Sequence, residues 1–307
     1  MKKPLFGIIP PLVTPLIDAN HLDIEGLERL IEHVIQGGVH GIFILGTTGE
    51  AQSLSFTLRT GMIRQTSRIV KGRLPLLVGI SDTSMADSIK LAQTALEFGA
   101  DALVSAPPYY FATGQPELAG FYENLVPQLP LPVFLYNMPA HTKVSFAPDT
   151  IKRIAQNPNV AGFKDSSANG AYFQSVMYEM REYKDFSIFA GPEEMTAEAV
   201  LMGANGGVNG GANMFPRLYV ELYRAARDKD IERVRMLHTH VMQICSSIYT
   251  IGNFASSYLK GVKCALSLLG ICNDFLAAPF NKFGTEHRER IRKALELLDI
   301  DLIGNKK

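Results

Sequence analysis

The 307-residue sequence has few cysteines, and their spacing is not that of a disulfide-rich or zinc-binding protein. Its three cysteines, Cys245, Cys264 and Cys272, form no CxxC pair and have no histidine nearby at metal-ligand spacing. Disulfide frameworks and structural zinc sites both need more cysteines at regular, closer spacings. We therefore expect reduced, packed thiols and no bound metal.

The sequence also lacks an excess of charge of either sign and any long apolar run. With 30 basic and 30 acidic residues, its totals do not indicate a nucleic acid or an anionic membrane as partner. No apolar run approaches the roughly 20 residues of a membrane-spanning helix. The opening MKKPLFGIIPPLVTPLI resembles a signal peptide, but Pro10, Pro11 and Pro15 interrupt it. We expect a first strand there, in a cytoplasmic protein.

What the sequence does contain is a regular alternation of short apolar runs with longer segments of helical period. This alternation is typical of βα units and a parallel sheet. The runs recur about every 20 to 35 residues, which suits one βα unit each. The eight candidate strands are FGIIPP from Phe6, GIFIL from Gly41, LPLLVGI from Leu74, DALVSA from Asp101, PVFLYN from Pro132, VAGFK from Val160, FSIFAG from Phe186 and GGVNGG from Gly206.

Between these runs lie segments with the caps and the apolar face of surface helices. One begins at Asp23, a favourable N-cap residue, and ends at Gly37 and Gly38. Eight such units close naturally into an α/β fold of the (β/α)8 TIM-barrel type. The competing fold is an open doubly wound sheet, whose dinucleotide-binding form needs GxGxxG where this chain has PPLVTPLID. The expected apolar face of the first helix is Ile24, Leu27, Leu30, Ile31 and Val34.

Three more helical segments follow the eighth unit, which ends near Arg227. They are IERVRMLHTHVMQICSSIY, SYLKGVKCALSLLG and TEHRERIRKALELLDI, more than one closing helix requires. We predict a catalytic barrel over residues 1–227 and a three-helix C-terminal domain over residues 228–307. The sequence leaves open whether this domain packs below the barrel or forms an oligomer contact.

Lys164 ends the sixth candidate strand, directly after the apolar residues VAGF. In barrels of this type the chemistry lies at the C-terminal ends of the strands. An amine attacks a carbonyl only when unprotonated, and burial of an amine favours its neutral form. Lys164 is therefore a candidate Schiff-base nucleophile. The alternative is a structural lysine that extends to solvent or pairs with Asp165.

Other strand ends carry hydroxyl groups. Tyr136 ends the fifth strand, where a phenol can transfer protons, although a core aromatic is an equal interpretation. In GTTGE, Gly46 permits close backbone approach while Thr47 and Thr48 offer donors suited to a carboxylate, although a plain turn would look the same. Tyr110, after the fourth strand, can equally be an aromatic that fills the barrel mouth.

The motifs GTTGE, YY, YNMP and GFKDSS occur in this order at the ends of the second, fourth, fifth and sixth predicted strands. In this combination the sequence resembles the dihydrodipicolinate synthase and N-acetylneuraminate lyase family of class I aldolases, over nearly the whole chain. The resemblance implies a barrel with a C-terminal helical domain, commonly a homotetramer, without a metal or organic cofactor. It also implies that the substrates are pyruvate, or a related 2-oxo acid, and an aldehyde.

By position, the resemblance assigns the Schiff base to Lys164 and the acid/base role to Tyr136. Thr47 would link Tyr136 to Tyr110 in a proton relay, and Thr48 would hold the carboxylate of the 2-oxo acid. Further candidate substrate-binding residues are Gly46 of the same loop, Ser166 of GFKDSS and Asn209 of the glycine-rich run GANGGVNGGANMF.

His141 is a departure from dihydrodipicolinate synthases, which are similar in having YN-x-P-S-R-T where this chain has YNMPAHTK. Their arginine binds the carboxylate of the aldehyde, and a histidine cannot make that bidentate, permanently charged contact. Glu193 and Glu194 follow the seventh strand, where sialate lyases place acidic residues that bind substrate hydroxyls; solvated rim charges are an equal interpretation. We therefore expect a 2-keto-3-deoxy sugar acid or a sialic acid as the aldol.

Three other functions stay open on the sequence. The same Schiff base can serve condensation of pyruvate with aspartate semialdehyde, which His141 disfavours. A dehydratase of keto-deoxy sugar acids can use the same scaffold. A non-catalytic relative that only binds a 2-oxo acid would keep the fold as well.

Overall fold

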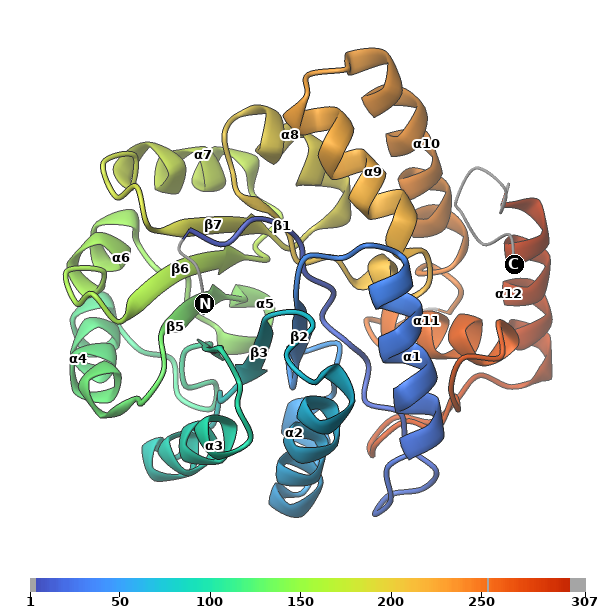
Figure 1. Cartoon of the computed structure of the whole chain (residues 1–307), viewed down its shortest axis with the longest axis horizontal. Coiled ribbons are helices and arrows are strands. Elements are labelled where there is room, and N and C mark those ends of the chain that lie inside the picture. The colour runs from blue at the N-terminus through green and yellow to red at the C-terminus, as the bar shows by residue number, and fades with distance from the viewer. Residues whose placement is uncertain (1–3, 253, 299–307) are drawn as a thin grey trace.

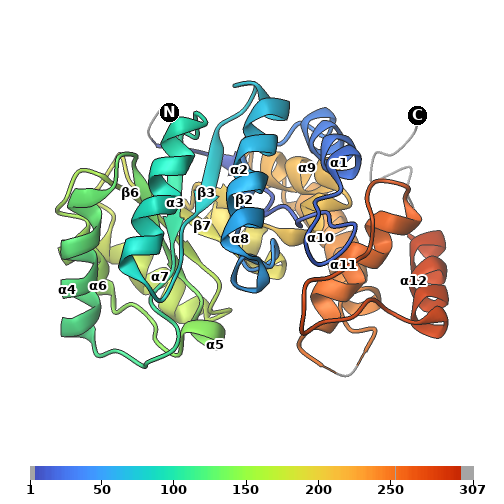
Figure 2. The ribbon, with the colours of Figure 1, turned by 90° about the horizontal axis from the view of Figure 1, so that it is seen from below.

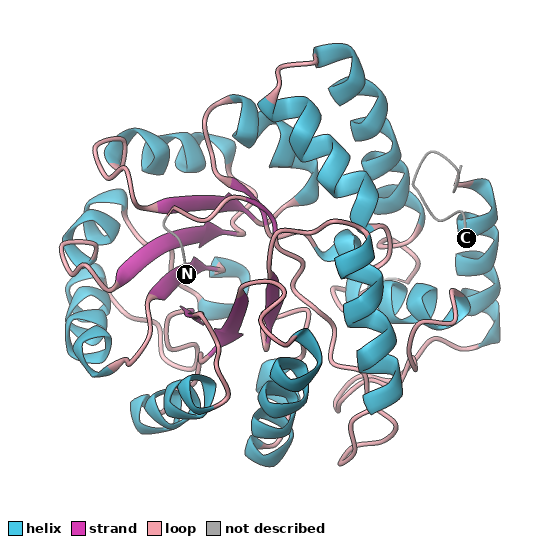
Figure 3. Cartoon of the chain, in the orientation of Figure 1, coloured by secondary structure: helices cyan, strands magenta, loops and turns pink. Residues whose placement is uncertain are grey.

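Eight parallel strands form a ring at the centre of the molecule, with helices around it (Figure 1). The computed structural model describes residues 4–252 and 254–298, so the start of the predicted barrel domain and the end of the predicted C-terminal domain lie outside the described residues. All eight predicted strands are present, and Figure 3 shows them in magenta inside the helices. They are β1 (Gly7–Ile8), β2 (Ile42–Ile44), β3 (Leu76–Gly79), β4 (Ala102–Ser105), β5 (Val133–Asn137), β6 (Val160–Asp165), β7 (Ser187–Ala190) and β8 (Gly206–Gly207).

The ring follows chain order and closes between the first two strands. Neighbours pair in the order β1-β8-β7-β6-β5-β4-β3-β2. Beyond the end of β1, Pro11 forms an isolated parallel bridge with Phe43 of β2. The Phe43 N–H donates to the Pro10 carbonyl at 3.1 Å, and the Leu12 N–H donates to the Phe43 carbonyl at 2.8 Å. Because proline has no N–H, Pro11 donates no hydrogen bond across this seam.

Alternate residues of each strand point into the barrel or out toward the helices. The interior is filled by a separate apolar cluster, with small residues where neighbouring strands approach closely. A Cβ on Gly162 would lie 2.4 Å from the Ser187 carbonyl oxygen and 2.5 Å from the Phe134 ring. The interior cluster consists of Leu5, Ile9, Phe43, Leu77, Ala102, Val104, Ala106, Phe134, Tyr136, Ala161, Phe189 and Val208.

The helices cover the outside of the ring, and the first of them largely follows the sequence prediction. Asp23 caps α1 by accepting from the Gly26 N–H at 2.8 Å. Ile24, predicted on the buried face, is 38% exposed because it lies in the first turn. The helices are α1 (Ile24–Gln36), α2 (Phe56–Val70), α3 (Met85–Glu97), α4 (Gln115–Leu125), α5 (Pro139–Thr142), α6 (Pro148–Ile154), α7 (Gly170–Glu179), α8 (Thr196–Leu201), α9 (Pro216–Arg227), α10 (Ile231–Ser247), α11 (Ser257–Leu268) and α12 (Thr285–Leu297).

The helices α10, α11 and α12 form the predicted C-terminal helical domain, on one side of the barrel (Figures 1 and 2). Its first helix contacts α9 and the short 3-10 helix η3 (Glu193–Met195), and α11 contacts α12 and η4 (Gly210–Asn213). Because η3 and η4 follow β7 and β8, the domain packs at the mouth end of the barrel. Among the described residues no helix is long and apolar enough to cross a membrane.

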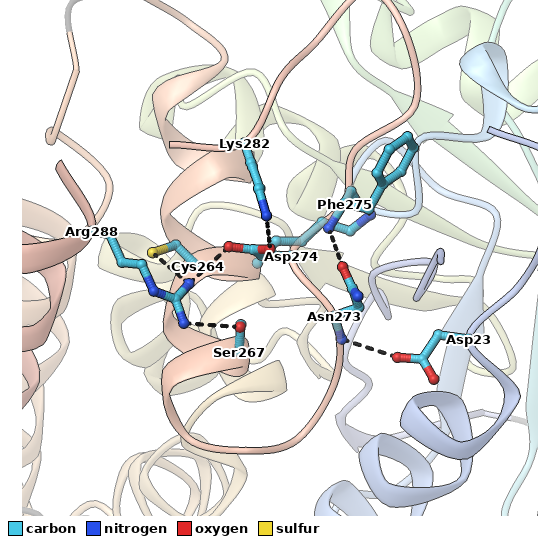
Figure 4. Close-up of polar contacts among 9 residues, drawn as sticks. Asp23, Cys264, Ser267, Asn273, Asp274, Phe275, Lys282 and Arg288 are labelled. Carbon is cyan, nitrogen blue, oxygen red and sulfur yellow. Dashed lines mark hydrogen bonds and ion pairs between the residues drawn. The ribbon is translucent and has the colours of Figure 1, made fainter. Parts of the chain in front are cut away.

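A polar cluster fixes the segment between α11 and α12 to the barrel (Figure 4). The Asn273 N–H donates to the second carboxylate oxygen of Asp23 at 3.0 Å, so the cap of α1 also holds the C-terminal domain. Asp274 accepts from Arg288 at 2.8 Å and pairs with Lys282 at 3.6 Å. The three cysteines are free and buried, as expected.

Candidate active site

A cavity of about 320 Å³ opens at the C-terminal ends of the strands. The loops after β2, β3, β4 and β5 form most of its wall, and Leu259 of α11 and Phe280 of the segment between α11 and α12 close one side. Three predicted site residues with hydroxyl or imidazole groups, Thr47, Tyr136 and His141, line this cavity. The cavity is lined by Phe43, Leu45, Gly46, Thr47, Glu50, Gln52, Ser53, Ser81, Ala106, Tyr109, Tyr136, Met138, His141, Thr142, Leu259 and Phe280.

Lys164 lies inside the barrel below this cavity, in aromatic and apolar surroundings. It is 6% exposed and is the strand neighbour of Tyr136 on β5. Its Nζ lies 4.1 Å from the centre of the Tyr136 ring and 5.3 Å from the centre of the Phe43 ring. A second, apolar cavity of about 10 Å³ beneath it is lined by Ile9, Phe43, Leu77, Val104, Phe134, Lys164, Phe189 and Val208.

Asp165, the alternative partner considered for Lys164, is occupied elsewhere. Its Oδ1 accepts from Asn137 at 2.8 Å and from the Ser167 N–H at 3.0 Å, and its Oδ2 accepts from the Ser167 hydroxyl at 2.8 Å. Burial raises the pKa of Asp165 above its ordinary value, while these hydrogen bonds oppose the rise. None of the ion pairs within the described ranges includes Lys164. The structure therefore does not support a salt-bridged Lys164.

The GTTGE loop places the Thr47 side chain in the cavity wall and the Thr48 side chain in a buried position behind it. The Thr47 hydroxyl is 3.2 Å from the Tyr136 hydroxyl, so the predicted pair forms within one chain. The Thr48 hydroxyl is 3.1 Å from the hydroxyl of Tyr258 on α11. Tyr258 was not a sequence candidate, because its contact with Thr48 spans 210 positions and no local pattern indicates it.

Tyr110 does not join these hydroxyl groups in the described chain. Its side chain is 71% exposed, and its ring packs edge-on against Phe111 at 5.0 Å. Its neighbour Tyr109 lines the cavity instead. Burial raises the pKa of Tyr109, with the Asp82 carboxylate adding to the rise. The expected relay from Thr47 to Tyr110 is thus not formed within one chain.

His141 lies at the cavity wall, where the sequence predicted a contact with the aldehyde half. It is exposed and belongs to the short helix α5, which begins at Pro139 directly after β5. Gly46 also lines the cavity, close to the Phe43 ring. These two candidates are placed where a bound substrate can reach them.

Glu193 and Glu194 do not face the cavity, which corrects the prediction of substrate-binding acids. Glu193 is 5% exposed, and its carboxylate accepts from the Gly211 N–H at 2.5 Å, from the Tyr249 hydroxyl at 2.9 Å and from the Tyr219 hydroxyl. Glu194 is exposed and lies outside the cavity lining. The Glu193 carboxylate, at the start of η3, binds Tyr219 and Tyr249, so it does not line the cavity.

Ser166 and Asn209 also lie behind the cavity wall. Asn209 is fully buried, and its amide donates to the Thr196 hydroxyl at 2.8 Å and to the Gly191 carbonyl at 3.3 Å. Ser166 is partly buried, and its Oγ lies 2.1 Å from the point where a Cβ on Gly191 would stand. Their contacts join the loops after β6, β7 and β8, so this geometry makes them supports of the site rather than substrate ligands.

A buried ion pair that the sequence analysis missed borders the cavity. Glu50, which closes the GTTGE motif, pairs with Lys263 of α11, and the two residues are 5% and 0% exposed. Lys263 also donates to the Phe275 carbonyl at 2.6 Å, and Glu50 accepts from the Ala277 N–H at 2.8 Å. Burial lowers the pKa of Lys263, and Glu50 opposes that shift. The pair links the GTTGE loop to the C-terminal domain.

Comparisons with known proteins agree with the barrel fold. Residues 4–298 match the model of the dihydrodipicolinate synthetase family. A 4-hydroxy-tetrahydrodipicolinate synthase of Methanoculleus marisnigri is 31% identical, with 94% of this chain and 98% of that protein covered. A probable 2-dehydro-3-deoxy-D-pentonate aldolase of Escherichia coli K12 is 29% identical, with 96% and 97% covered. A solved structure described as dihydrodipicolinate synthase from Bacteroides thetaiotaomicron is 68% identical, with a TM-score of 0.95 and 96% and 99% covered.

Proposed function

The chain belongs to the dihydrodipicolinate synthetase family of pyruvate-dependent class I aldolases, and from this premise we propose that it cleaves or forms a 2-keto-3-deoxy sugar acid or a sialic acid. The observation that carries the proposal is the contact of Lys164, Tyr136 and Thr47 beside a cavity whose wall contains His141. Pyruvate is one half of the aldol, and an aldehyde with a polyol tail is the other.

Lys164 is the proposed nucleophile. Its neutral amine adds to C2 of the 2-oxo acid, and loss of water from the carbinolamine gives an iminium. The apolar residues around Lys164 leave its amine without a hydrogen-bonded carboxylate among the described residues, and an unpaired amine is the group that a Schiff-base mechanism needs. The position of Nζ at the Tyr136 ring leads the covalent intermediate into the cavity above.

Tyr136 and Thr47 are the proposed proton-transfer pair. The C4 hydroxyl loses its proton to this pair while the C3–C4 bond breaks. The electrons of that bond form the C2–C3 double bond, so the iminium becomes an enamine. The aldehyde leaves, C3 of the enamine takes up a proton, and water hydrolyses the resulting iminium to pyruvate and free Lys164. A hydroxyl at 3.2 Å from the Tyr136 phenol is well placed to exchange that proton.

Thr48 and the Gly46 backbone are proposed to bind the carboxylate of the 2-oxo acid. Thr48 follows Thr47 on the same loop, so a substrate linked to Lys164 meets both threonines. Gly46 has no side chain in the cavity wall, which lets the substrate approach the backbone donors of the loop. Hydroxyl and N–H donors are suited to a carboxylate because hydrogen bonds to a charged acceptor are the stronger ones.

His141 is proposed to contact the aldehyde half and to favour an uncharged polyol. The other polar side chains in the cavity wall include Gln52, Ser53, Ser81 and Thr142, which suit hydroxyl groups. The described lining contains no arginine and no lysine to bind a second carboxylate. A dicarboxylic product would therefore leave one carboxylate without a cationic partner in this wall.

The test is a screen of 2-keto-3-deoxy sugar acids and sialic acids for pyruvate release, run beside condensation of pyruvate with aspartate semialdehyde. We expect release from at least one sugar acid at a kcat/KM above that of the condensation. A His141→Arg variant should move the ratio toward aspartate semialdehyde, because it restores a carboxylate-binding cation. Condensation that exceeds every cleavage in the parent protein would contradict the proposed substrate class.

The second candidate is condensation with aspartate semialdehyde. It is favoured by the relatives described as synthases, above all the 68% identical structure. A dehydratase of keto-deoxy sugar acids is distinguished in the same screen by its product, since it releases water and keeps the C3–C4 bond.

We also propose the cytoplasmic homotetramer that the family resemblance implies. The exposed neighbours Tyr110 and Phe111, at 71% and 76%, offer an apolar surface for contact between copies. Sedimentation analysis should give four times the 33.8 kDa chain mass. A monomer at micromolar concentration would contradict this assembly.

A further inference from the structure

A group of hydroxyls and one carboxylate lies buried behind the barrel mouth, at the junction with the C-terminal domain. We call it the Glu193 cluster, and it consists of Glu193, Gly211, Tyr219 and Tyr249. One carboxylate oxygen of Glu193 accepts from the Gly211 N–H at 2.5 Å, and the other accepts from the hydroxyls of Tyr219 and Tyr249. The three donors come from η4, from α9 and from the segment after α10.

The Glu193 cluster extends to the GTTGE loop through one more tyrosine. The ring of Tyr249 packs edge-on against the ring of Tyr258, with centroids 4.8 Å apart. The Tyr258 hydroxyl is 3.1 Å from the Thr48 hydroxyl. The path from Glu193 to Thr48 therefore contains two hydrogen bonds and one ring contact, all between side chains.

The backbone around this path is packed closely enough to hold it in one arrangement. A Cβ on Gly210 would lie 1.6 Å from the Tyr258 hydroxyl oxygen. A Cβ on Gly211 would lie 2.0 Å from the Tyr219 hydroxyl oxygen and 2.7 Å from Glu193 Oε2. Both glycines are thus needed for the hydroxyls to reach their partners, and neither tyrosine hydroxyl has free space beside it.

Burying a carboxylate costs free energy because the charged group loses its hydration, so packing alone does not explain Glu193. Within the part of the chain that the structure describes, no basic side chain pairs with Glu193. The titratable groups around it are Tyr219, Tyr249, Tyr258, Cys245 of α10 and the exposed Glu194. Burial raises the pKa of Glu193 to about 7, against the opposing effect of its three hydrogen-bond donors. Apolar residues of similar volume are often as stable as such buried charges, so a specific arrangement of donors is the better explanation.

We propose that Glu193 is a positioning residue, which through Tyr249 and Tyr258 aims the Thr48 hydroxyl at the carboxylate of the bound 2-oxo acid. The inference rests on the proposed role of Thr48. The Glu193 carboxylate accepts the hydrogen bond from the Tyr249 hydroxyl, and this bond holds the Tyr249 ring against the Tyr258 ring. This positioning requires Tyr258 to be the donor to the Thr48 oxygen, which leaves the Thr48 proton free for the substrate carboxylate. The C-terminal domain thereby contributes to 2-oxo acid binding without contacting the substrate.

The experiment measures how much pyruvate half-saturates the borohydride-trapped adduct on Lys164. Tyr258→Phe removes the hydroxyl that holds Thr48 and keeps the ring, and Glu193→Gln keeps the size of the side chain and removes its charge. Tyr219→Phe is the comparison variant, since it removes a hydrogen bond to the same Glu193 oxygen and keeps the hydroxyls of Tyr249 and Tyr258 that form the path to Thr48. Thermal unfolding of each variant shows whether the fold is kept.

We expect the half-saturating pyruvate concentration to rise about tenfold in Tyr258→Phe and about three- to tenfold in Glu193→Gln, with the trapped amount at saturation unchanged. Tyr219→Phe should stay within about twofold of the parent protein. If the parent gives no adduct on Lys164, the proposed function itself fails. If the parent gives the adduct and Tyr258→Phe keeps the parent value, or Tyr219→Phe rises equally, only this inference is overturned.

Discussion

Lys164 and Asp165 are neighbours in sequence but have opposite roles, because successive residues of a strand point to opposite faces. Lys164 faces the barrel interior, with Tyr136 and Phe43 around its amine. Asp165 faces outward and binds Asn137 and Ser167. Asp165 therefore does not form a hydrogen-bonded pair with Lys164, and the amine is available to react with a substrate.

The hydroxyl of Tyr136 is expected to act in proton transfer and not in forming the Schiff base. Tyr136→Phe should lower kcat about 10²- to 10³-fold, because it removes the group that exchanges protons with the substrate. The pyruvate adduct on Lys164 should still be trapped, since the amine is intact. Tyr122→Phe is the control, because Tyr122 is a fully buried tyrosine whose hydroxyl donates to the Ser105 carbonyl away from the cavity. Equal losses in the two variants would contradict the role.

Sequence reasoning found the residues that lie at strand ends and missed those that act through long-range contacts. Lys164, Tyr136 and Thr47 could be predicted because the ends of parallel strands meet at one mouth. The contact of Tyr258 with Thr48 and the environment of Glu193 could not be predicted, because the partners lie 26, 56 and 210 positions apart in sequence. The 3-10 helix η3 directs Glu193 to a buried position against Tyr219 and Tyr249, and no local sequence pattern predicts this direction.

At the scale of elements, strand positions were predictable because each strand is a short buried run between polar or glycine-rich turns. The docking of the C-terminal domain was not predictable, since it depends on contacts such as that of Asp23 with Asn273. Amphipathic periodicity indicates that a helix has a partner, but it does not say which surface the partner presents.

Asp23 is expected to stabilise both α1 and the attachment of the C-terminal domain. Asp23→Ala should cost about 2 kcal/mol in the free energy of unfolding, because the cap and the bond from Asn273 are both lost. Asp230→Ala is a matched control that removes only a cap, the one that accepts from the Arg233 N–H at 3.1 Å, and should cost about 1 kcal/mol. Chemical unfolding of both variants measures the difference. Equal costs would show that the contact with Asn273 adds no stability.

The Glu50–Lys263 pair is expected to couple strongly, because breaking it leaves a buried charge without a partner. Lys263→Met and Glu50→Gln should each lower the free energy of unfolding by about 3 kcal/mol or more. The double variant should lose less than the sum of the two single losses, by at least about 1 kcal/mol. A double-mutant cycle in urea measures this coupling. Additive losses would mean that the two charges are solvated independently.

At the scale of the whole molecule, the pH dependence of stability is expected to report on Glu193. Its folded-state pKa, raised to about 7 by burial, lies above the ordinary value of 4.5. The folded protein therefore holds this proton more tightly than the unfolded chain, and the associated stability is present below pH 4.5 and lost as the pH rises through about 7.

Glu193→Gln has no titrating group at this position and should not suffer that loss. Relative to the parent protein, the variant should gain up to about 3 kcal/mol in the free energy of unfolding between pH 4.5 and pH 8. Urea unfolding of both proteins over this range, at one protein concentration, gives the difference. A difference that does not change with pH would contradict the raised pKa of Glu193.

The proposed function of the whole molecule depends on one step, the formation of a Schiff base between Lys164 and a 2-oxo acid. The most direct measurement is incubation with pyruvate and borohydride, followed by peptide mass spectrometry. The expected result is a reduced pyruvyl group on Lys164 in the parent protein and none in Lys164→Ala. No adduct on Lys164, or an adduct on Lys263, the other buried lysine at the mouth, would contradict it.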